Sequence, residues 1–192
     1  MTHNPSPDLA EPITTERFRL EVVPPDVLRA ISEIGSDEEV EWAGVGPVPR
    51  ALAATMPASL RIRQAEADPT VSCWLIRGIV TTDPTSATGV RLIGHIGGHD
   101  RPNPDGMVEA GYTVAAADRG HGVATEAARA WFGWAHRHGG KIARLSIEPS
   151  NAPSVAVARN LGLRPGVQLW DEDDQVWEMV FEAPLPLVST PL

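Results

Sequence analysis

The stretch "GYTVAAADRGHGVATEA", residues 111–127, decides the fold because it joins a strand pattern to a helix pattern through two glycines. Residues 107–115 alternate between two faces, as a strand does. From about His121 to His138 the apolar residues recur at helical spacing, and a glycine pair follows. Gly120 and Gly122 therefore lie at a strand-to-helix junction.

The glycines of this junction allow two interpretations. A helix N-terminus presents unpaired N–H groups and the positive end of its dipole, so a backbone without Cβ atoms can approach a phosphate. Gly120 and Gly122 remove Cβ atoms, Arg119 supplies a cation, and Ala124 keeps the first turn small. The alternative is a loop in which glycine only permits turning. Short glycine patterns do not separate the two.

Two other phosphate-binding motifs fit the glycine stretch poorly. A Walker A loop needs Gly-Lys followed by Ser or Thr, and this tripeptide is absent from the sequence. The dinucleotide-binding fingerprint needs Gly or Ala where Thr125 stands, and it opens a parallel βαβ unit. Here the preceding strand pattern follows a hairpin.

The flanking sequence predicts an α/β domain. A strand pattern over residues 17–23 leads to a helix near Asp26, and the last helix has Ser150 or Asn151 as its N-cap. Residues 51–67 favour helix but contain prolines that break it. Further strands are expected at 71–80, 90–98, 107–115, 142–148, 164–170 and 175–181. We expect one domain over residues 13–184, with a flexible N-terminal tail (1–12) and a C-terminal tail (185–192).

Composition narrows the class of protein. With 192 residues and 42% hydrophobic content, the chain can bury the core of one soluble domain. The net charge of −9 opposes binding to nucleic acid and to anionic membranes. We find no signal-peptide pattern and no apolar stretch that would span a membrane. Cys73 is the single cysteine, which is compatible with the cytoplasm, and it is expected in the core of an apolar strand.

The glycine stretch, followed by "IEPSNAPSVAVARNLGLRPG" (residues 147–166), resembles the GNAT superfamily of acyl-CoA-dependent N-acetyltransferases. The closest resemblance is to the RimJ/RimL-type branch, which acetylates ribosomal-protein N-termini and related small amines. It is specific over residues 90–166, and the order of elements extends it to 17–182. The resemblance implies a central mixed, mostly antiparallel sheet of about seven strands flanked by helices.

The same resemblance implies the residues that bind acetyl-CoA as co-substrate. The superfamily signature Arg/Gln-x-x-Gly-x-Gly/Ala falls on Arg119, Gly122 and Ala124, with Gly120 as the extra glycine of this branch. Backbone around Thr113 and Val114 would bind the pantetheine arm as a strand would, and Asn151 would lie beside the cofactor. No metal is implied. The pyrophosphate would be held by N–H groups of His121, Gly122, Val123, Ala124 and Thr125.

Acetyl transfer to an amine needs a neutral nucleophile, a stabilised oxyanion and a proton for the departing thiolate. Strand alternation places Glu109, Gly111 and Thr113 on one face, away from Val108 and its even-numbered neighbours. Glu109 is thus the candidate base, acting directly or through water. Its alternative is a solvated carboxylate on the strand face.

The acid that protonates the thiolate is harder to assign. Many superfamily members use a tyrosine on the helix after Asn151, and this helix has none. Ser154 stands where the branch carries a serine implicated at the CoA sulfur, with a capping or surface role as the alternative. Tyr112 is expected to pack or to line the cofactor groove.

Other polar and aromatic residues have simpler expected roles. His95 and His99 lie about 13 Å apart on a strand, too far to share a metal ion. The "DEDD" run, residues 171–174, is expected to be a solvated hairpin tip rather than a loop that recognises cations. Trp42 lies either in the acceptor pocket or in the core.

We therefore expect a direct acetyl-CoA-dependent N-acetyltransferase whose acceptor is a protein N-terminus or a small-molecule amine. The alternative is a non-catalytic acyl-CoA-binding or sensing domain on the same fold. A nucleotide-dependent enzyme is the weaker third interpretation. The sequence leaves the acceptor and the oligomeric state open, a homodimer included.

Overall fold

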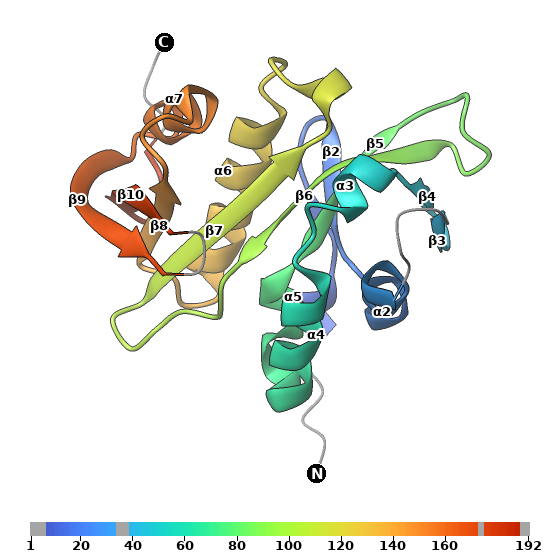
Figure 1. Ribbon diagram of the computed structural model, residues 1–192, viewed down its shortest axis with the longest axis horizontal. Coiled ribbons are helices and arrows are strands. Elements are labelled where there is room, and N and C mark those ends of the chain that lie inside the picture. The colour runs from blue at the N-terminus through green and yellow to red at the C-terminus, as the bar shows by residue number, and fades with distance from the viewer. Residues whose placement is uncertain (1–6, 34–38, 173–174, 189–192) are drawn as a thin grey trace.

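The computed structural model describes residues 7–33, 39–172 and 175–188. Eight strands form one twisted sheet in the order β1-β2-β5-β6-β7-β8-β10-β9, and β3 and β4 form a separate hairpin (Figure 1). The strands are β1 Ile13–Thr14, β2 Phe18–Val22, β3 Val40–Trp42, β4 Gly46–Val48, β5 Arg77–Thr82, β6 Val90–Gly98, β7 Met107–Val114, β8 Ile142–Ile147, β9 Arg164–Asp171 and β10 Val176–Pro184.

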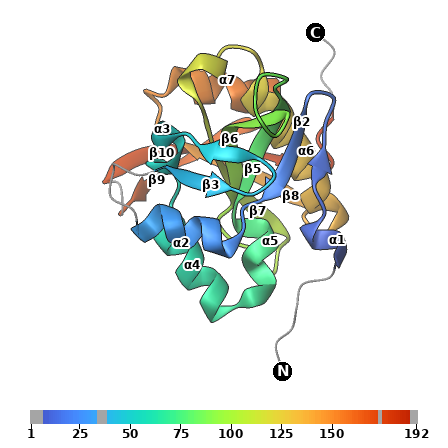
Figure 2. The same ribbon diagram turned by 90° about the vertical axis from the view of Figure 1, so that its right-hand side faces the viewer.

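The helices divide between the two faces of the sheet (Figures 1 and 2). Helices α6 and α7 pack on one face, and α2 to α4 pack on the other with the small hairpin. The α-helices are α1 Pro7–Ala10, α2 Pro25–Glu33, α3 Arg50–Ala53, α4 Ala58–Ala67, α5 Ser72–Leu75, α6 Val123–Arg137 and α7 Ala152–Asn160, and the 3-10 turns are η1 Pro69–Val71 and η2 Ala116–Asp118.

The sheet is mixed and mostly antiparallel, as the resemblance implied, with eight strands where about seven were expected. The pair β7–β8 is its parallel junction, and it is short. Residues 107–109 pair with residues 142–144, after which β7 continues to Val114 with pairing on the β6 side alone. The sheet therefore opens between β7 and β8 toward their C-terminal ends.

Two apolar clusters fill the domain. The larger lies between the sheet and α6, where Trp131 and Phe132 are fully buried and Trp74 of α5 packs on Trp134. The second lies under α2 to α4 and contains Trp42, which is 4% exposed. Trp42 is therefore a core residue, the second of the two roles that the sequence allowed.

A buried arginine attaches the N-terminal segment to the sheet. Arg77 on β5 is fully buried, and its guanidinium donates to the carbonyl oxygens of Leu9, Glu11 and Leu20. Burial lowers the pKa of Arg77 to about 10. Leu9 and Glu11, in the segment that we assigned to a flexible tail, thus contact Arg77 through their carbonyl oxygens. At the other end, the Leu185 N–H donates to the carbonyl oxygen of Lys141.

The strand predicted over residues 71–80 is wrong for residues 71–76. Residues 69–75 form η1 and α5, and β5 begins only at Arg77. An apolar run without polar alternation fits a buried helix as well as a buried strand, because both faces are covered. Cys73 is buried as expected, although in a helix. None of the helices within the described residues is long and apolar enough to cross a membrane.

Candidate active site

The loop between β7 and α6 has the geometry of an anion-binding helix N-terminus. Gly120 and Gly122 have φ of +78° and +75°, the left-handed region in which other residues are strained. Gly122 is the N-cap of α6 and has no side chain to cap the first N–H groups. These N–H groups, from Val123 onward, are available to an external acceptor such as a phosphate oxygen.

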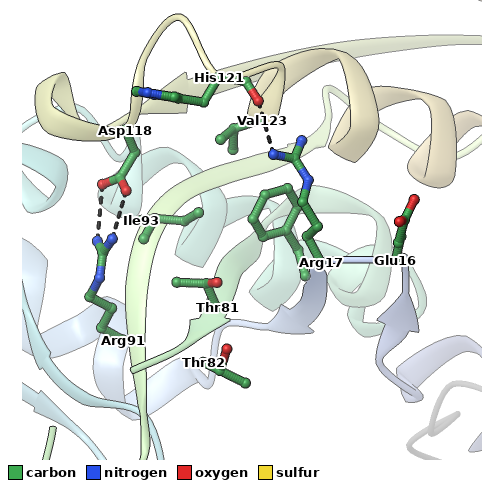
Figure 3. A pocket seen from close by; sticks show the side chains of 10 residues that line it. Glu16, Arg17, Thr81, Thr82, Arg91, Ile93, Asp118, His121 and Val123 are labelled. Carbon is green, nitrogen blue, oxygen red and sulfur yellow. Dashed lines mark hydrogen bonds and ion pairs between the residues drawn. The ribbon is translucent and has the colours of Figure 1, made fainter. Parts of the chain in front are cut away.

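Arg17, which directly precedes β2, braces this loop (Figure 3). Its Nη1 donates to the carbonyl oxygen of His121 at 3.0 Å, and its Nε donates to Glu126 at 2.7 Å. Glu126 also accepts a bond of 2.6 Å from the Thr15 hydroxyl. Burial acts to raise the pKa of Glu126, but the bonds from Thr15 and Arg17 outweigh it and lower that pKa.

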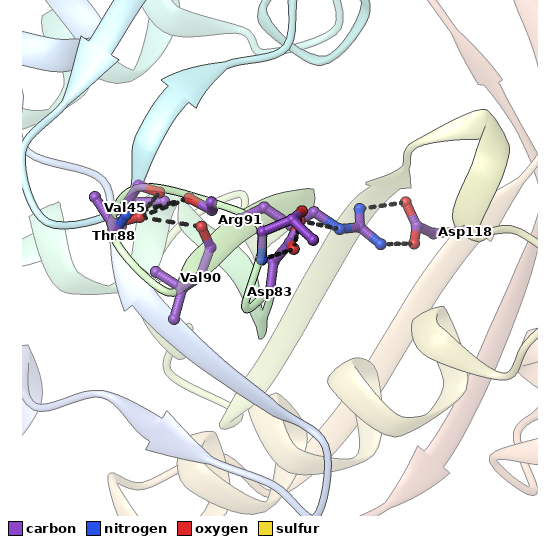
Figure 4. A network of polar contacts seen from close by, with 8 residues as sticks. Val45, Asp83, Thr88, Val90, Arg91 and Asp118 are labelled. Atoms are coloured by element: carbon purple, nitrogen blue, oxygen red, sulfur yellow. Dashed lines mark hydrogen bonds and ion pairs between the residues drawn. The ribbon is translucent and has the colours of Figure 1, made fainter.

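A second arginine holds the start of the loop (Figure 4). Arg91 on β6 donates two bonds to the Asp118 carboxylate, of 3.0 and 2.7 Å, and its Nε lies 3.5 Å from Asp83. The bonds from Arg91 lower the pKa of Asp118. Sequence reasoning missed Arg17 and Arg91, because their partners are 104 and 27 residues away and no local pattern marks them.

A cavity of about 490 Å³ lies between the two braces, under the loop (Figure 3). Each of its arginines already has a carboxylate partner, so the cavity has no surplus of positive charge. We therefore assign the cavity to the structural support of the loop and not to the binding of an anion. Its lining residues are Glu16, Arg17, Phe18, Thr81, Thr82, Arg91, Ile93, Asp118, His121 and Val123.

The backbone of β7 alternates between two neighbours. The His99 N–H donates to the Glu109 carbonyl oxygen, and the Ala115 N–H donates to the Ile93 carbonyl oxygen. The backbone N–H and C=O groups of the odd-numbered residues therefore face β6. Thr113 follows this pattern, so its backbone faces β6, away from the gap that pantetheine would enter.

The backbone groups directed into the gap belong to the even-numbered residues Tyr112 and Val114. The Val114 carbonyl is already in use, since it accepts a bond of 2.9 Å from Arg119 Nε.

Across the gap, Asn151 and Ser154 begin α7. The Asn151 side chain accepts a bond of 3.2 Å from the Ser154 N–H, which confirms Asn151 as the N-cap. The Tyr112 hydroxyl is buried beside Ser154 and has no well-formed hydrogen bond to a described residue. Burial raises the pKa of Tyr112, and the neighbouring Ser154 hydroxyl acts in the opposite direction.

Glu109 is half-buried on the sheet face opposite α6, where the alternation predicted it. Its Oε1 accepts a bond of 2.5 Å from the Ser146 hydroxyl on β8. Across the parallel junction it pairs with Arg144, whose guanidinium lies 2.7 Å from Glu182. The carboxylate is therefore held at the mouth of the gap between β7 and β8 without a direct ion pair to Arg144.

The sequence also raised a metal site and the acidic "DEDD" run as candidates. No group of three or more His, Cys, Asp or Glu within the described residues could hold a metal ion. Of the "DEDD" run, Asp171 ends β9 and Glu172 is exposed, whereas Asp173 and Asp174 lie outside the described residues. The adjoining hairpin carries a pair of exposed tryptophans, Trp170 and Trp177, at a ring-centroid distance of 5.6 Å.

Comparison with known proteins bears on the fold and on the family. A search of the curated proteins found no match. Among solved structures, a GNAT-family acetyltransferase from Bacillus anthracis is similar at 17% identity and a TM-score of 0.59, covering 91% of this chain and 98% of that one. RimJ from Mycobacterium smegmatis, in complex with CoA-disulfide, is similar at 16% identity and 0.58, covering 93% of each chain.

The ribosomal L7/L12 alpha-N-protein acetyltransferase RimL is similar at 12% identity and a TM-score of 0.59, covering 91% of this chain and 94% of that one. At these identities the likeness is one of fold. The family described as the acetyltransferase (GNAT) domain matches residues 17–164, which span the N-terminal brace, the glycine loop and α7. The chain therefore belongs to the GNAT acetyltransferase family.

Proposed function

We propose that this protein transfers the acetyl group of acetyl-CoA directly to a primary amine, either a protein N-terminus or a small-molecule amine. The observation that carries the proposal is the braced glycine loop at the N-terminus of α6, beside the gap between β7 and β8. A pyrophosphate at the loop and an extended arm in the gap match the two parts of CoA. RimJ, which shares the fold, holds a CoA derivative.

The proposed cofactor contacts follow from this placement. N–H groups from His121 to Thr125 would bind the pyrophosphate, with the free nitrogens of Arg119 beside them. Asn151 would lie along the opposite wall. The backbone contacts to pantetheine are proposed for Tyr112 and Val114, while Thr113 would contribute its side chain on the face shared with Glu109.

Glu109 is the proposed base, reaching the amine directly or through a water molecule. The neutral amine forms a C–N bond to the thioester carbonyl, the C–S bond breaks, and the thiolate takes up a proton. Ser154 is proposed to hydrogen-bond or protonate the sulfur. A CoA thiol leaves readily, so positioning in the gap supplies much of the rate.

The test is release of free thiol from acetyl-CoA with a panel of amines: serine- and alanine-initiated peptides, amino acids, a polyamine and an aminoglycoside. We expect at least one amine to release CoA and to gain an acetyl group by mass spectrometry. Tight acetyl-CoA binding without thiol release from any of them would instead identify a non-catalytic acyl-CoA-binding domain.

Two variants test the assigned residues. Glu109→Gln should lower kcat by about 100-fold, in the range of a lost general base. Ser154→Ala should lower kcat with little change in acetyl-CoA affinity. Unchanged kinetics in either variant would remove that residue from the mechanism.

A further inference from the structure

His99 lies directly opposite Glu109 across the β6–β7 pair. Residue 98 pairs with residue 110, and the His99 N–H donates to the Glu109 carbonyl oxygen at 3.0 Å. Directly opposed residues of an antiparallel pair project from the same face, with Cβ atoms roughly 5 Å apart. The imidazole and the carboxylate therefore share the face opposite α6.

The ring of His99 extends over a position without a side chain. Its Nε2 lies 3.7 Å from where a Cβ on Gly111 would stand. The residue is exposed, and its ring has no hydrogen bond or ion pair with any described residue. Its backbone is fixed by α4, because Gln64 Nε2 donates to the His99 carbonyl oxygen at 2.9 Å. A fixed backbone, with an unengaged ring on the strand face that also carries Glu109, is an arrangement suited to proton transfer.

His95, four residues earlier on the same face, shows the opposite arrangement. It is buried, and its Nε2 lies 3.1 Å from the Thr55 hydroxyl. Burial, with a smaller contribution from Arg61, lowers the pKa of His95 to about 4. His95 is thus neutral and enclosed at neutral pH, whereas His99 can meet a ligand.

We propose that His99 shares the base role with Glu109, an inference that rests on the proposed acetyltransferase function. A primary amine arrives at neutral pH as an ammonium group. Nε2 of His99 takes one proton from it, and the Glu109 carboxylate stabilises the imidazolium that results. The neutral amine then forms the C–N bond as the C–S bond breaks. The second amine proton goes to the CoA thiolate, and the imidazolium releases the first to solvent.

Charged groups surround this pair on several elements. From α4, Arg61 Nη1 lies 3.4 Å from the His99 carbonyl oxygen, and Asp100 is the next residue in the chain. Arg101 pairs with Asp68 at 2.9 Å. On the β8 side, the nearest charges are Arg144 and its partner Glu182.

The experiment is the pH profile of kcat/KM for wild type and His99→Asn, from pH 6 to 9.5, with the fastest α-amine of the panel, a peptide or an amino acid. We expect His99→Asn to lose about 100-fold at pH 7. The loss should shrink at least tenfold at pH 9.5, where an α-amine is neutral without a base. Acetyl-CoA affinity, measured by calorimetry, should match that of wild type, which shows that the variant is folded.

The matched control is His136→Asn, an exposed histidine of α6 that should keep the wild-type profile. An unchanged His99→Asn profile, or an equal loss at every pH, overturns the base role of His99. A wild-type protein that binds acetyl-CoA but acetylates no amine overturns the proposed function itself. The two failures are therefore distinct.

Discussion

The glycines of the cofactor loop and those of strand β6 serve different physical needs. A Cβ on Gly120 would meet nothing within 4 Å, and one on Gly122 would meet only the tip of Arg17 at 3.6 Å. In β6, a Cβ on Gly97 would stand 2.0 Å from the Leu75 carbonyl oxygen, and one on Gly94 would stand 2.4 Å from that of Thr113. The loop glycines have space but need a left-handed φ, whereas the strand glycines have ordinary φ but no space.

Glycine is therefore required in the two regions for different physical reasons. The loop stays open above its backbone, which is what a ligand requires. The strand is closed by the turn between α5 and β5, which packs directly on it. Substitution by alanine should therefore affect ligand binding at the loop, and should lower the unfolding free energy most strongly in the strand.

The largest effect is expected for Gly97→Ala. The new methyl group would overlap the Leu75 carbonyl, and displacing backbone in a packed core should cost about 3 kcal/mol or more of unfolding free energy. Urea denaturation measures it. Gly111→Ala, on the paired residue of β7, is the control, because its nearest neighbour would be His99 Nε2 at 3.7 Å. Equal stabilities of the two variants would refute the packing role of Gly97.

The burial of His95 on β6 also predicts that the stability of the fold depends on pH. Its pKa is about 4 in the folded protein and near 6.5 when unfolded, so the unfolded chain binds more protons between these values. Stability should therefore fall as the pH drops from 6.5 to 4, by about 3 kcal/mol. His95→Gln should flatten that slope, measured by denaturation at several pH values. A slope that survives the substitution would assign it to other groups.

On the loop side, Gly122→Ala should lower both stability and affinity. Forcing alanine to a φ of +75° costs about 1–2 kcal/mol, and relaxing that strain would turn the first N–H groups of α6 away from the pyrophosphate. We expect acetyl-CoA affinity by calorimetry to fall about tenfold. Gly133→Ala, inside α6 with open space around it, should instead add about 0.5–1 kcal/mol of stability and leave affinity unchanged.

The smallest effect concerns the braces of the loop. Asp118→Asn removes the charge that Arg91 pairs with, and since the arginine is 44% exposed, stability should change by less than about 1 kcal/mol. Acetyl-CoA affinity should fall about threefold because the loop is less well ordered. Arg19→Gln, which breaks the ion pair with Glu21 within β2, is the matched control and should leave affinity unchanged. A threefold loss of acetyl-CoA affinity in both variants would show that the loss is not specific to the contact between Arg91 and Asp118.

Much of the fold was predictable where a local pattern determines the structure. The strand over residues 90–98 has the predicted bounds, and the glycine loop, α6 and the Asn151 cap lie where the motif placed them. Helices α3 and α4, on either side of Pro57, agree with the broken helix predicted for residues 51–67. The hairpin of β3 and β4 was not predicted, because its three-residue strands are stabilised by tertiary contacts such as those of Trp42.

The candidate site was predictable in its loop and less so in its chemistry. Glu109 lies on the predicted face because strand alternation is a local property. The direction of the Thr113 backbone depends on which neighbour β7 pairs with, and the Arg17 brace depends on a partner 104 residues away. His99 was considered only as a metal ligand, because its place beside Glu109 follows from the register of two strands.

The short junction between β7 and β8 also affects how the domain unfolds. Within the main sheet, three residue pairs join β7 to β8. They connect the group of strands β1, β2, β5, β6 and β7 with the group β8, β10 and β9. Such a narrow connection lets one group open at a lower free energy than the whole domain. Amide hydrogen exchange should therefore show two levels of protection in the free protein. A ligand that spans the gap would merge them, so that acetyl-CoA would make the unfolding of the two groups cooperative.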